Sequence, residues 1–424
     1  MDGSKPEWRL KVKKYLVPIA LIIFIFLAGT GCREKTDERD LILLGIDALD
    51  WELMNPLLEQ GLLPQFQKLI RMGASAKINT NEEGGSAVYW TSIATGQHAD
   101  KHGIHGFVTT DPSSGQLVPY TSDMRKSKTF WNIFGDAGLT VGIVGWYISW
   151  PAEPVNGFML SSYLGMKGED QLTWKGTIYA DSPGMVYPES LQPEVDRIIR
   201  DIGKKYSNNL GLIIKSRALE ENSELILSTR EAFLSDEIYI EAGLFLLQRE
   251  RPQIFAVYLS GIDSIGHRFS HADPGAQQNY DRKYGKVQEN YYRYMDRVLG
   301  LYMKEMRANS IFVVVSDHGL REGEHTSDGV FICAGPGIRR GVRTLEEINL
   351  TDICPTLLYL LDFPVSAEMD GRVYSGIVEP SILTKKPVRF IPGYGKRENT
   401  AAVPLKSQFD EKIVERLKSL GYLK

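Results

Sequence analysis

The chain has 424 residues, of which 43% are hydrophobic and 24% charged, and its formal net charge is -4 at pH 7. This composition is typical of a globular protein and excludes a fibrous or largely disordered chain. The near-neutral charge provides no basic surface for a nucleic acid polymer, so we expect no such partner. The length allows one elaborated α/β domain or two to three smaller domains, and the sequence does not predict an oligomeric state.

An N-terminal export signal is predicted over residues 1–32. Five basic residues precede an apolar run over residues 15–28, which ends in Gly-Thr-Gly-Cys. This order of basic, apolar and small residues is typical of an export signal. The segment resembles a bacterial lipoprotein signal, in which Cys32 would be lipidated and anchor the protein in the cell envelope, with its catalytic domain outside the cytoplasm. The alternatives are an uncleaved N-terminal membrane helix and a soluble cytoplasmic chain.

Residues 33–40 are predicted to be a charged tether, because almost every side chain in Arg-Glu-Lys-Thr-Asp-Glu-Arg-Asp is charged. The folded domain is predicted over residues 41–424. Besides Cys32, the chain contains only Cys333 and Cys354, which excludes a disulfide-rich scaffold and a zinc site built from cysteines. Any metal must therefore be held by histidine and carboxylate side chains.

Short, continuously apolar runs in this domain predict strands that are covered on both faces. Helical stretches separate them, so the fold class is α/β, with a mostly parallel central sheet and helices on both faces. Strand-like runs are widely spaced in the region of about 151–249, which is predicted to be a cap inserted above the sheet. Strands are expected at 41–46, 140–146, 254–260, 311–316 and 330–334, and helices at 127–137, 215–249, 276–309, 352–361 and 410–420.

Aspartate and histidine side chains follow three of the predicted strands. Functional residues of such sheets lie just past the carboxyl ends of the strands. Several like charges at one edge require cations nearby, so a site for two metal ions is predicted. Mixed imidazole and carboxylate ligands suit zinc best, with manganese as the alternative. The candidate ligands are Asp47, Asp263, His267, Asp317, His318 and His325.

The spacing of these residues suggests how they meet. Asp263 and His267 are four residues apart, so a helical turn would direct both at one ion. Asp317 and His318 are adjacent, and an extended strand would send them in opposite directions. We therefore expect a tight turn that redirects one of them toward the ion.

A candidate nucleophile lies in the stretch 84–96. Two glycines permit a close backbone approach, and Ser86 stands where a helix could start. A helix N-terminus beside a cation favours an alkoxide and binds phosphate. Ser86 could instead only cap the helix, and Thr91, Ser92 and Thr95 offer competing hydroxyls.

The order of these motifs resembles the alkaline phosphatase superfamily, specifically its type I phosphodiesterase and nucleotide pyrophosphatase family. The resemblance extends from Leu41 to about Val373. The motifs that carry it are Gly45–Trp51, the stretch 86–96 followed by His102-Gly103-Ile104, Asp263-Ser-Ile-Gly-His267, Ser316-Asp-His-Gly319, His325 with Gly329, and 351–358.

This resemblance implies how the site works. One metal would be held by Asp263, His267 and His325. The second would be held by Asp47, Asp317, His318 and the Ser86 oxygen. Ser86 would attack phosphorus in line, one ion activating it and the other stabilising the leaving oxygen, and water would later hydrolyse the phosphoenzyme.

Two departures from the family pattern bear on the substrate. Most members carry threonine where Ser86 stands, which keeps the hydroxyl. By count from the nucleophile, Phe107 occupies the position of an asparagine that helps to hold the phosphoryl group in nucleotide pyrophosphatases. This disfavours nucleotides and suggests another small phosphate ester, such as a lipid head group or a glycerol phosphodiester.

The sequence also leaves other functions to compare with this one. A phosphonate hydrolase or a phosphoryl-group transferase acting on lipid head groups would use the same metals. A sulfatase is disfavoured because Ser86 lacks the C-x-P-x-R-like context, and an α/β-hydrolase because no glycine closes a nucleophile elbow. From another class, the chain could be a lipoprotein with a purely structural metal site. The spacing of His98, His102 and His105 does not argue for a further metal site, and His102 is expected to be structural.

Overall fold

The computed structural model describes residues 39–164, 183–220, 223–271, 273–398, 405–407 and 410–419. The predicted export signal, with Cys32, and most of the charged tether lie outside the described residues. In the part of the chain that is described, no helix has the length and apolar character needed to cross a membrane.

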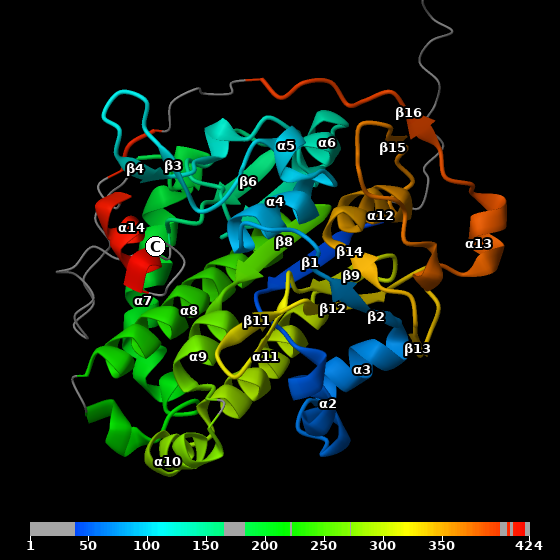
Figure 1. The fold of residues 1–424 in the computed structure, drawn as a ribbon. Helices are drawn as coiled ribbons and strands as arrows, with labels where there is room; N and C mark the ends of the chain where they lie inside the picture. Colours follow the sequence, from blue (N-terminus) through cyan, green and yellow to red (C-terminus); the bar gives the residue numbers. More distant parts are fainter. Residues whose placement is uncertain are drawn as a thin grey trace, which may run out of the picture. The chain divides into compact units, whose positions relative to one another are not determined.

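A single large sheet forms the centre of the domain (Figure 1). Its strands follow the order β13-β2-β12-β9-β1-β8-β5-β6-β7, and β14 also pairs with β2. The strands β9, β1, β8, β5 and β6 are mutually parallel, whereas β12 and β7 are antiparallel to their neighbours. The bounds are β1 Leu41–Ile46, β2 Ala74–Asn79, β5 Val141–Val144, β6 Gly157–Leu160, β7 Val186–Tyr187, β8 Ile254–Leu259, β9 Ile311–Val315, β12 Asp328–Ala334, β13 Val342–Arg343 and β14 Ile348–Asn349.

Helices cover both faces of this sheet, as predicted. Alternate residues of β1 point to opposite sides, with Leu44 in one core cluster and Leu43 in the other. One cluster includes α2 (Trp51–Glu59), α3 (Pro64–Met72), α7 (Gln192–Leu210), α8 (Glu224–Glu250), α9 (Gly261–Phe269) and α11 (Val287–Met303). The other includes α4 (Ser86–Thr95), α6 (Phe130–Asp136) and α12 (Ile353–Leu360). The fold class is therefore confirmed.

The strand directions determine where the connecting loops gather. Because β12 is antiparallel to both β9 and β2, β2 runs in the same direction as β9 and β1. The carboxyl ends of β1, β2, β8 and β9 consequently lie at one edge of the sheet, and the segments that follow these strands meet there.

Two predicted helices differ from the structure. The helix expected over 276–309 is two helices, α10 (Pro274–Tyr284) and α11, separated at Gly285, whose φ of 91° is readily adopted only by glycine. The helix expected over 215–249 is a 3-10 turn, η3 (Ser216–Glu220), followed by α8. The strand β2 was not predicted, because Ala-Ser-Ala-Lys-Ile-Asn lacks a continuous apolar run.

The region 151–249 also differs from the expected cap. Its strands β6 and β7 extend the main sheet, and α8 belongs to the core cluster on one face of that sheet. The apolar residues of these elements pack into the main core. The division of the domain into a catalytic part and an inserted cap stays a prediction.

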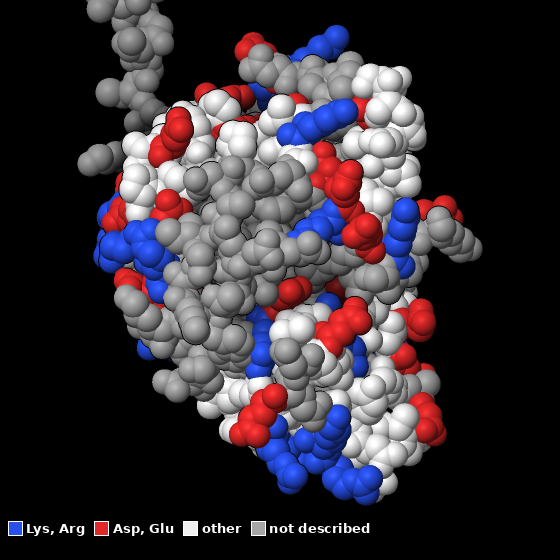
Figure 2. All heavy atoms as spheres, turned by 90° about the vertical axis from the view of Figure 1, so that its left-hand side faces the viewer, with Lys and Arg blue, Asp and Glu red and all other residues white. Residues whose placement is uncertain are grey.

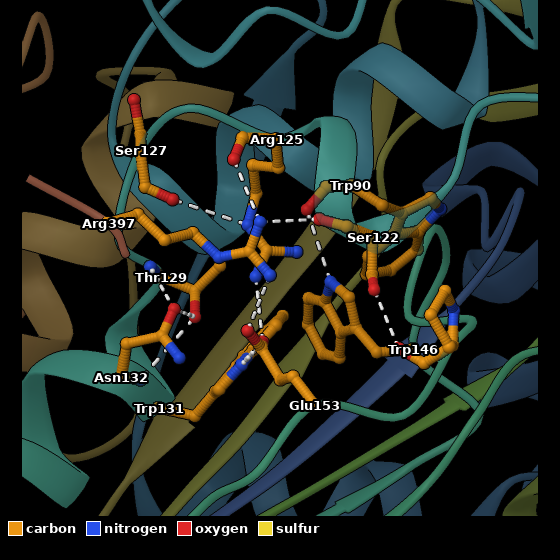
Figure 3. A network of polar contacts seen from close by, with 11 residues as sticks. Trp90, Ser122, Arg125, Ser127, Thr129, Trp131, Asn132, Trp146, Glu153 and Arg397 are labelled. Atoms are coloured by element: carbon orange, nitrogen blue, oxygen red, sulfur yellow. Dashed lines mark hydrogen bonds and ion pairs between the residues drawn. The ribbon is translucent and has the colours of Figure 1, made fainter. Parts of the chain in front are cut away.

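A buried ion-pair network ties the C-terminal segment to the loop after β5 (Figure 3). Glu153 accepts from Arg125 and from Arg397, each at 2.7 Å, and from the Trp131 indole at 2.6 Å. Burial would raise the pKa of Glu153, but the two guanidinium groups lower it to about 2, so the carboxylate stays charged. The network therefore fixes residues that are distant in sequence.

The remaining elements are peripheral to the sheet. A short hairpin, β10–β11, follows β9, and another, β3–β4, follows α4 and α5. The bounds of these and the last elements are α5 Ala99–His102, β3 Val108–Thr110, β4 Leu117–Pro119, η1 Ser122–Met124, η2 Glu189–Leu191, β10 Gly319–Arg321, β11 Glu324–Thr326, η4 Leu350–Asp352, β15 Val365–Ser366, η5 Ser375–Ile377, α13 Pro380–Lys385, β16 Phe390–Ile391 and α14 Asp410–Ser419.

Candidate metal centre and active site

The structure brings the predicted site residues together at the edge where β1, β2, β8 and β9 end. They come from the ends of β1 and β9, from α9 after β8, from the hairpin β10–β11, and from the first residue of α4. This placement follows from the parallel strand order, since each strand delivers its following residues to the same edge. The residues are Asp47, Ser86, Asp263, His267, Asp317, His318 and His325.

Asp263, His267 and His325 form the first group. Asp263 Oδ1 lies 3.2 Å from the Nε2 atoms of both His267 and His325, and these two nitrogens are 2.8 Å apart. His267 donates its Nδ1–H to the carbonyl of Gly323 at 2.9 Å, which leaves Nε2 as the ligand atom. Two imidazole nitrogens and a carboxylate oxygen therefore converge, as the ligands of a zinc ion do.

Asp47, Asp317, His318 and Ser86 form the second group. His318 Nε2 lies 3.2 Å from Asp47 Oδ1, 3.4 Å from Asp317 Oδ2 and 3.3 Å from Ser86 Oγ. His318 donates its Nδ1–H to the Gly319 carbonyl at 3.0 Å, so its Nε2 also faces the centre. All four side chains of this group are buried.

The two groups adjoin at His318. Its ring stacks on that of His325 with centroids 3.9 Å apart. Ligand atoms of Asp263, His318 and His325 lie within 4.8 Å of one another, as do those of Asp47, Asp317 and His318. Two neighbouring cation positions that share one set of side chains suit a two-metal centre.

A tight turn directs both Asp317 and His318 into the centre, as expected from their adjacency. Ser316 Oγ donates to the carbonyl of His318 at 2.7 Å and accepts from the backbone of Leu49 at 2.9 Å. The side chain thus closes the turn after β9 and attaches it to the turn after β1.

Buried carboxylate oxygens at this centre lack hydrogen-bond partners. Among the described residues, no hydrogen bond reaches Asp47 Oδ1, Asp263 Oδ1 or either carboxylate oxygen of Asp317. Asp317 has no hydrogen bond to either oxygen from a described residue, and leaving a buried carboxylate without a partner costs several kcal/mol, on the order of the penalty for a desolvated ion. Divalent cations would remove this penalty, so the donor set fits the metal ions that the sequence predicts.

The electrostatics lead to the same conclusion. Burial raises the pKa of Asp317 well above its usual value, and the negative charge of Asp47 raises it further. Burial alone would lower the pKa of His318, but Asp317 and Asp47 raise it to about 10. Asp317 and His318 therefore hold their protons tightly, at the positions where a metal ion would supply positive charge.

Tyr258 and Trp90 orient Asp47, and the sequence analysis missed both. The Tyr258 hydroxyl donates to Asp47 Oδ2 at 2.5 Å, and the Trp90 indole N–H donates to the same oxygen at 3.3 Å. This leaves Oδ1 directed toward His318. The Trp90 ring also needs Gly45, because a Cβ there would lie 2.6 Å from a ring carbon. The sequence signal for Tyr258 was its place in a strand predicted to be buried, because a buried phenol hydroxyl requires a polar partner.

The competing hydroxyls of α4 are engaged elsewhere. Thr91 donates to the carbonyl of Ala87 at 2.7 Å, and Thr95 to that of Thr91 at 2.8 Å. Ser92 donates to Glu82 at 2.6 Å. Of the hydroxyl groups weighed from the sequence, Ser86 is therefore the one that faces the ligand groups.

His102 has the structural role that was expected. It accepts from the backbone of Ile104 through Nδ1 and donates from Nε2 to Ser92 Oγ, each at 3.1 Å. Burial lowers the pKa of His102 to about 3, so the ring is neutral. His98 instead contacts Glu82 at the surface, and His105 is exposed. The three histidines therefore do not converge on one ion.

A family model, type I phosphodiesterase / nucleotide pyrophosphatase, matches residues 41–333. The chain belongs to this family. It is accordingly a phosphoester hydrolase, as predicted from the motifs, and metal dependence is typical of its family. No curated protein matches the sequence.

Several solved structures are similar to this chain. Wild-type alkaline phosphatase PafA is similar with a TM-score of 0.52 and 14% identity, covering 80% of this chain and 99% of its own. Human ectonucleotide pyrophosphatase / phosphodiesterase 5 gives a TM-score of 0.40 and 13% identity, covering 78% and 97%. Phosphonoacetate hydrolase from Sinorhizobium meliloti 1021 gives 0.39 and 19%, covering 66% and 56%. Because PafA is only 14% identical to this chain, its similarity establishes the fold alone.

His325→Ala is expected to lower the metal content by about one ion per chain, because the first group would lose one of three protein ligands. Elemental analysis of zinc-loaded protein checks this, with exposed His105→Ala as the matched control. Unchanged stoichiometry in His325→Ala would remove His325 from the ligand set.

Tyr258→Phe is expected to weaken zinc binding at the second group by about 10- to 100-fold, because Asp47 loses the donor that orients it. A competitive chelator titration measures the affinity. Tyr359→Phe is the matched control, since the Tyr359 hydroxyl bonds to the carbonyl of Lys386. Equal affinities in both variants would show that Tyr258 does not position this ligand.

Proposed function

We propose that this chain hydrolyses phosphodiesters through a covalent phosphoserine at Ser86, with zinc ions bound in the two ligand groups. The observation that carries the proposal is the position of the Ser86 hydroxyl, 3.3 Å from His318 Nε2 among buried carboxylates. A serine that only capped a helix would not need to face a cluster of metal-binding side chains.

The N-terminus of α4 supports the proposed attack. Gly85 precedes Ser86 with a φ of 77°, a conformation that glycine adopts without strain, and α4 continues for ten residues. Backbone N–H groups and the helix dipole at this end favour negative charge on a hydroxyl and on a phosphoryl group. The helix thereby supplies phosphate-binding groups beside the proposed nucleophile.

Bound divalent ions supply positive charge that lowers the pKa of the hydroxyl and neutralises phosphoryl oxygens. Ser86 Oγ attacks phosphorus in line, so that a Ser86 O–P bond forms as the bond from phosphorus to the leaving ester oxygen breaks. The hydroxyl of Ser86 releases its proton to solvent, and the leaving oxygen takes up a proton from solvent. A water molecule then attacks the phosphoserine, and Ser86 recovers its hydroxyl as the second product leaves. Asp47, Asp317 and His318 hold their places throughout.

Apolar side chains beside Ser86 support a diester with a lipid-type or glycerol substituent over a nucleotide. Phe107 packs against Gly85, where a Cβ would lie 2.6 Å from the ring. Its ring offers no hydrogen bond to a phosphoryl oxygen, unlike the asparagine that the family resemblance places at this position. Ala87, Ile104 and Ile148 form a small apolar cluster here, against which Phe107, Tyr120, Met124 and Tyr147 pack.

We further propose that the protein is exported and anchored to the bacterial cell envelope by lipidated Cys32. The support is the order of basic, apolar and small residues before Cys32. An anchor of this kind would keep the hydrolase outside the cytoplasm.

Ser86→Ala is expected to lower kcat/KM for a chromogenic phosphodiester by more than about 10³-fold while the protein keeps its metal. Ser86→Thr restores a hydroxyl and should retain turnover. Thr91→Ala is the control on the same helix. Turnover that survives in Ser86→Ala and is lost in Thr91→Ala would assign the attack to Thr91, and turnover surviving in both would assign it to water.

The substrate class is tested in the same preparation by comparing a phosphodiester, a monoester, a phosphonate and a sulfate ester. We expect the diester to have the highest kcat/KM, with glycerol phosphodiesters ahead of nucleotides. No turnover of any ester by fully metallated protein would favour a binding protein with a structural metal site.

Cys32→Ser is expected to release the protein from membranes into the soluble fraction, because the lipid attachment site is lost. Fractionation of cells that express the wild type and the variant measures this. Cys333→Ser is the control, since Cys333 is buried in the domain. Membrane retention of Cys32→Ser would indicate an uncleaved N-terminal helix.

A further inference from the structure

A groove lies at the edge of the sheet opposite the metal centre. At this edge β9 and β2 begin and β12 ends, and the chain segments there enclose a volume of about 820 Å³. The groove is formed by the end of α3, the end of α11 with the connection to β9, and the turn after β12. We call it the basic groove; its main lining residues are Lys68, Arg71, Met72, Met303, Arg307 and Arg340.

The charged residues that line the basic groove are all positive. Four of its lining residues are lysine or arginine, and none of the residues that line it is acidic. Arg307 forms an ion pair with Asp40 at 2.8 Å. Lys68, Arg71 and Arg340 are exposed and form no ion pair with any other residue that the structure describes. On the face drawn in Figure 2, by contrast, basic and acidic side chains are interspersed.

Methionine side chains lie among these cations. Met72 is 38% exposed, and Met303 and Met306 are half-buried at the groove. Flexible apolar side chains surrounded by long cationic ones suit the boundary between lipid head groups and acyl chains, where the cations reach phosphates. A site for a small soluble anion would have no use for the exposed thioether.

The chain enters the domain at this same edge. The backbone N–H of Ile311 donates to the carbonyl of Asp40 at 2.7 Å, and that of Leu41 to Gln253 at 2.8 Å, so the start of β1 is fixed. Cys32 precedes Asp40 by eight residues. A fully extended segment of that length reaches at most about 29 Å. If Cys32 is lipidated, the basic groove must stay close to the bilayer.

We infer that the basic groove is a docking surface for a membrane that contains anionic phospholipid. The orientation of the domain on the membrane rests on the proposed lipid anchor. The attraction of the basic groove to anionic lipid rests on the positive charge of the groove itself. The bilayer then lies against the edge where the strands begin, and the metal centre, beyond the six residues of β1, faces the aqueous side.

Hydrogen–deuterium exchange of the full-length protein tests the inference. The measurement uses vesicles of phosphatidylcholine alone and vesicles that also contain phosphatidylglycerol. Residues 304–310, which connect α11 to β9 at the groove, are expected to exchange about threefold more slowly with the anionic vesicles. High salt should remove this protection. The exposed turn of the β3–β4 hairpin, residues 112–116, should not respond.

Charge reversal gives the matched comparison. A variant that combines Lys68→Glu, Arg71→Glu and Arg340→Glu should lose the protection of residues 304–310 by anionic vesicles. Reversal of three exposed cations away from the groove, at Arg217, Arg282 and Lys286, should leave it unchanged. Zinc content and thermal midpoint show that each variant is folded. Because the readout is amide exchange, the result does not depend on turnover or on Cys32.

Two outcomes would overturn the docking surface. Protection that is equal with phosphatidylcholine alone would show that the charges play no part. Protection by inorganic phosphate without vesicles would make the groove a site for a small anion.

Discussion

The convergence of buried carboxylates around His318 is the constraint on which the site depends. Asp47 and Asp317 approach one imidazole nitrogen at 3.2 and 3.4 Å, in a place where water does not screen their charge. Their mutual repulsion and lost hydration make this arrangement unfavourable without positive charge. Bound cations would remove this cost, because the same fold without them must keep protons on groups that would otherwise be ionised.

The structure stabilises this unfavourable cluster through contacts made away from the metal positions. Backbone carbonyls of Gly323 and Gly319 hold the Nδ1 atoms of His267 and His318. Tyr258 holds the other carboxylate oxygen of Asp47. Each contact leaves one ligand atom directed inward, so the geometry is set before a metal binds, which reduces the ordering cost of binding.

Much of this centre was predictable because of how parallel sheets are built. The runs that became β1, β8 and β9 are apolar throughout, so both their faces are buried and their following residues must emerge at one edge. The strand β2 was not predictable in this manner, since it contains Ser75 and Lys77 and is recognised only through its pairing with other strands, β12 above all. The Tyr258 contact joins residues 211 positions apart, a relation that no local pattern expresses.

The same strand order also separates two kinds of chemistry. Carboxylates and imidazoles collect where β1, β8 and β9 end. Cations, three of which form no ion pair with a described residue, collect where β9 and β2 begin. A phosphodiester is itself an anion, so a basic surface beside the centre would retain the product as well as attract the substrate. Cations at the far edge instead act on the anionic surface of a membrane, at a distance of about 20 Å along β1, which exceeds the Debye length of about 8 Å at physiological salt. Membrane attraction and catalysis are thereby kept electrostatically independent.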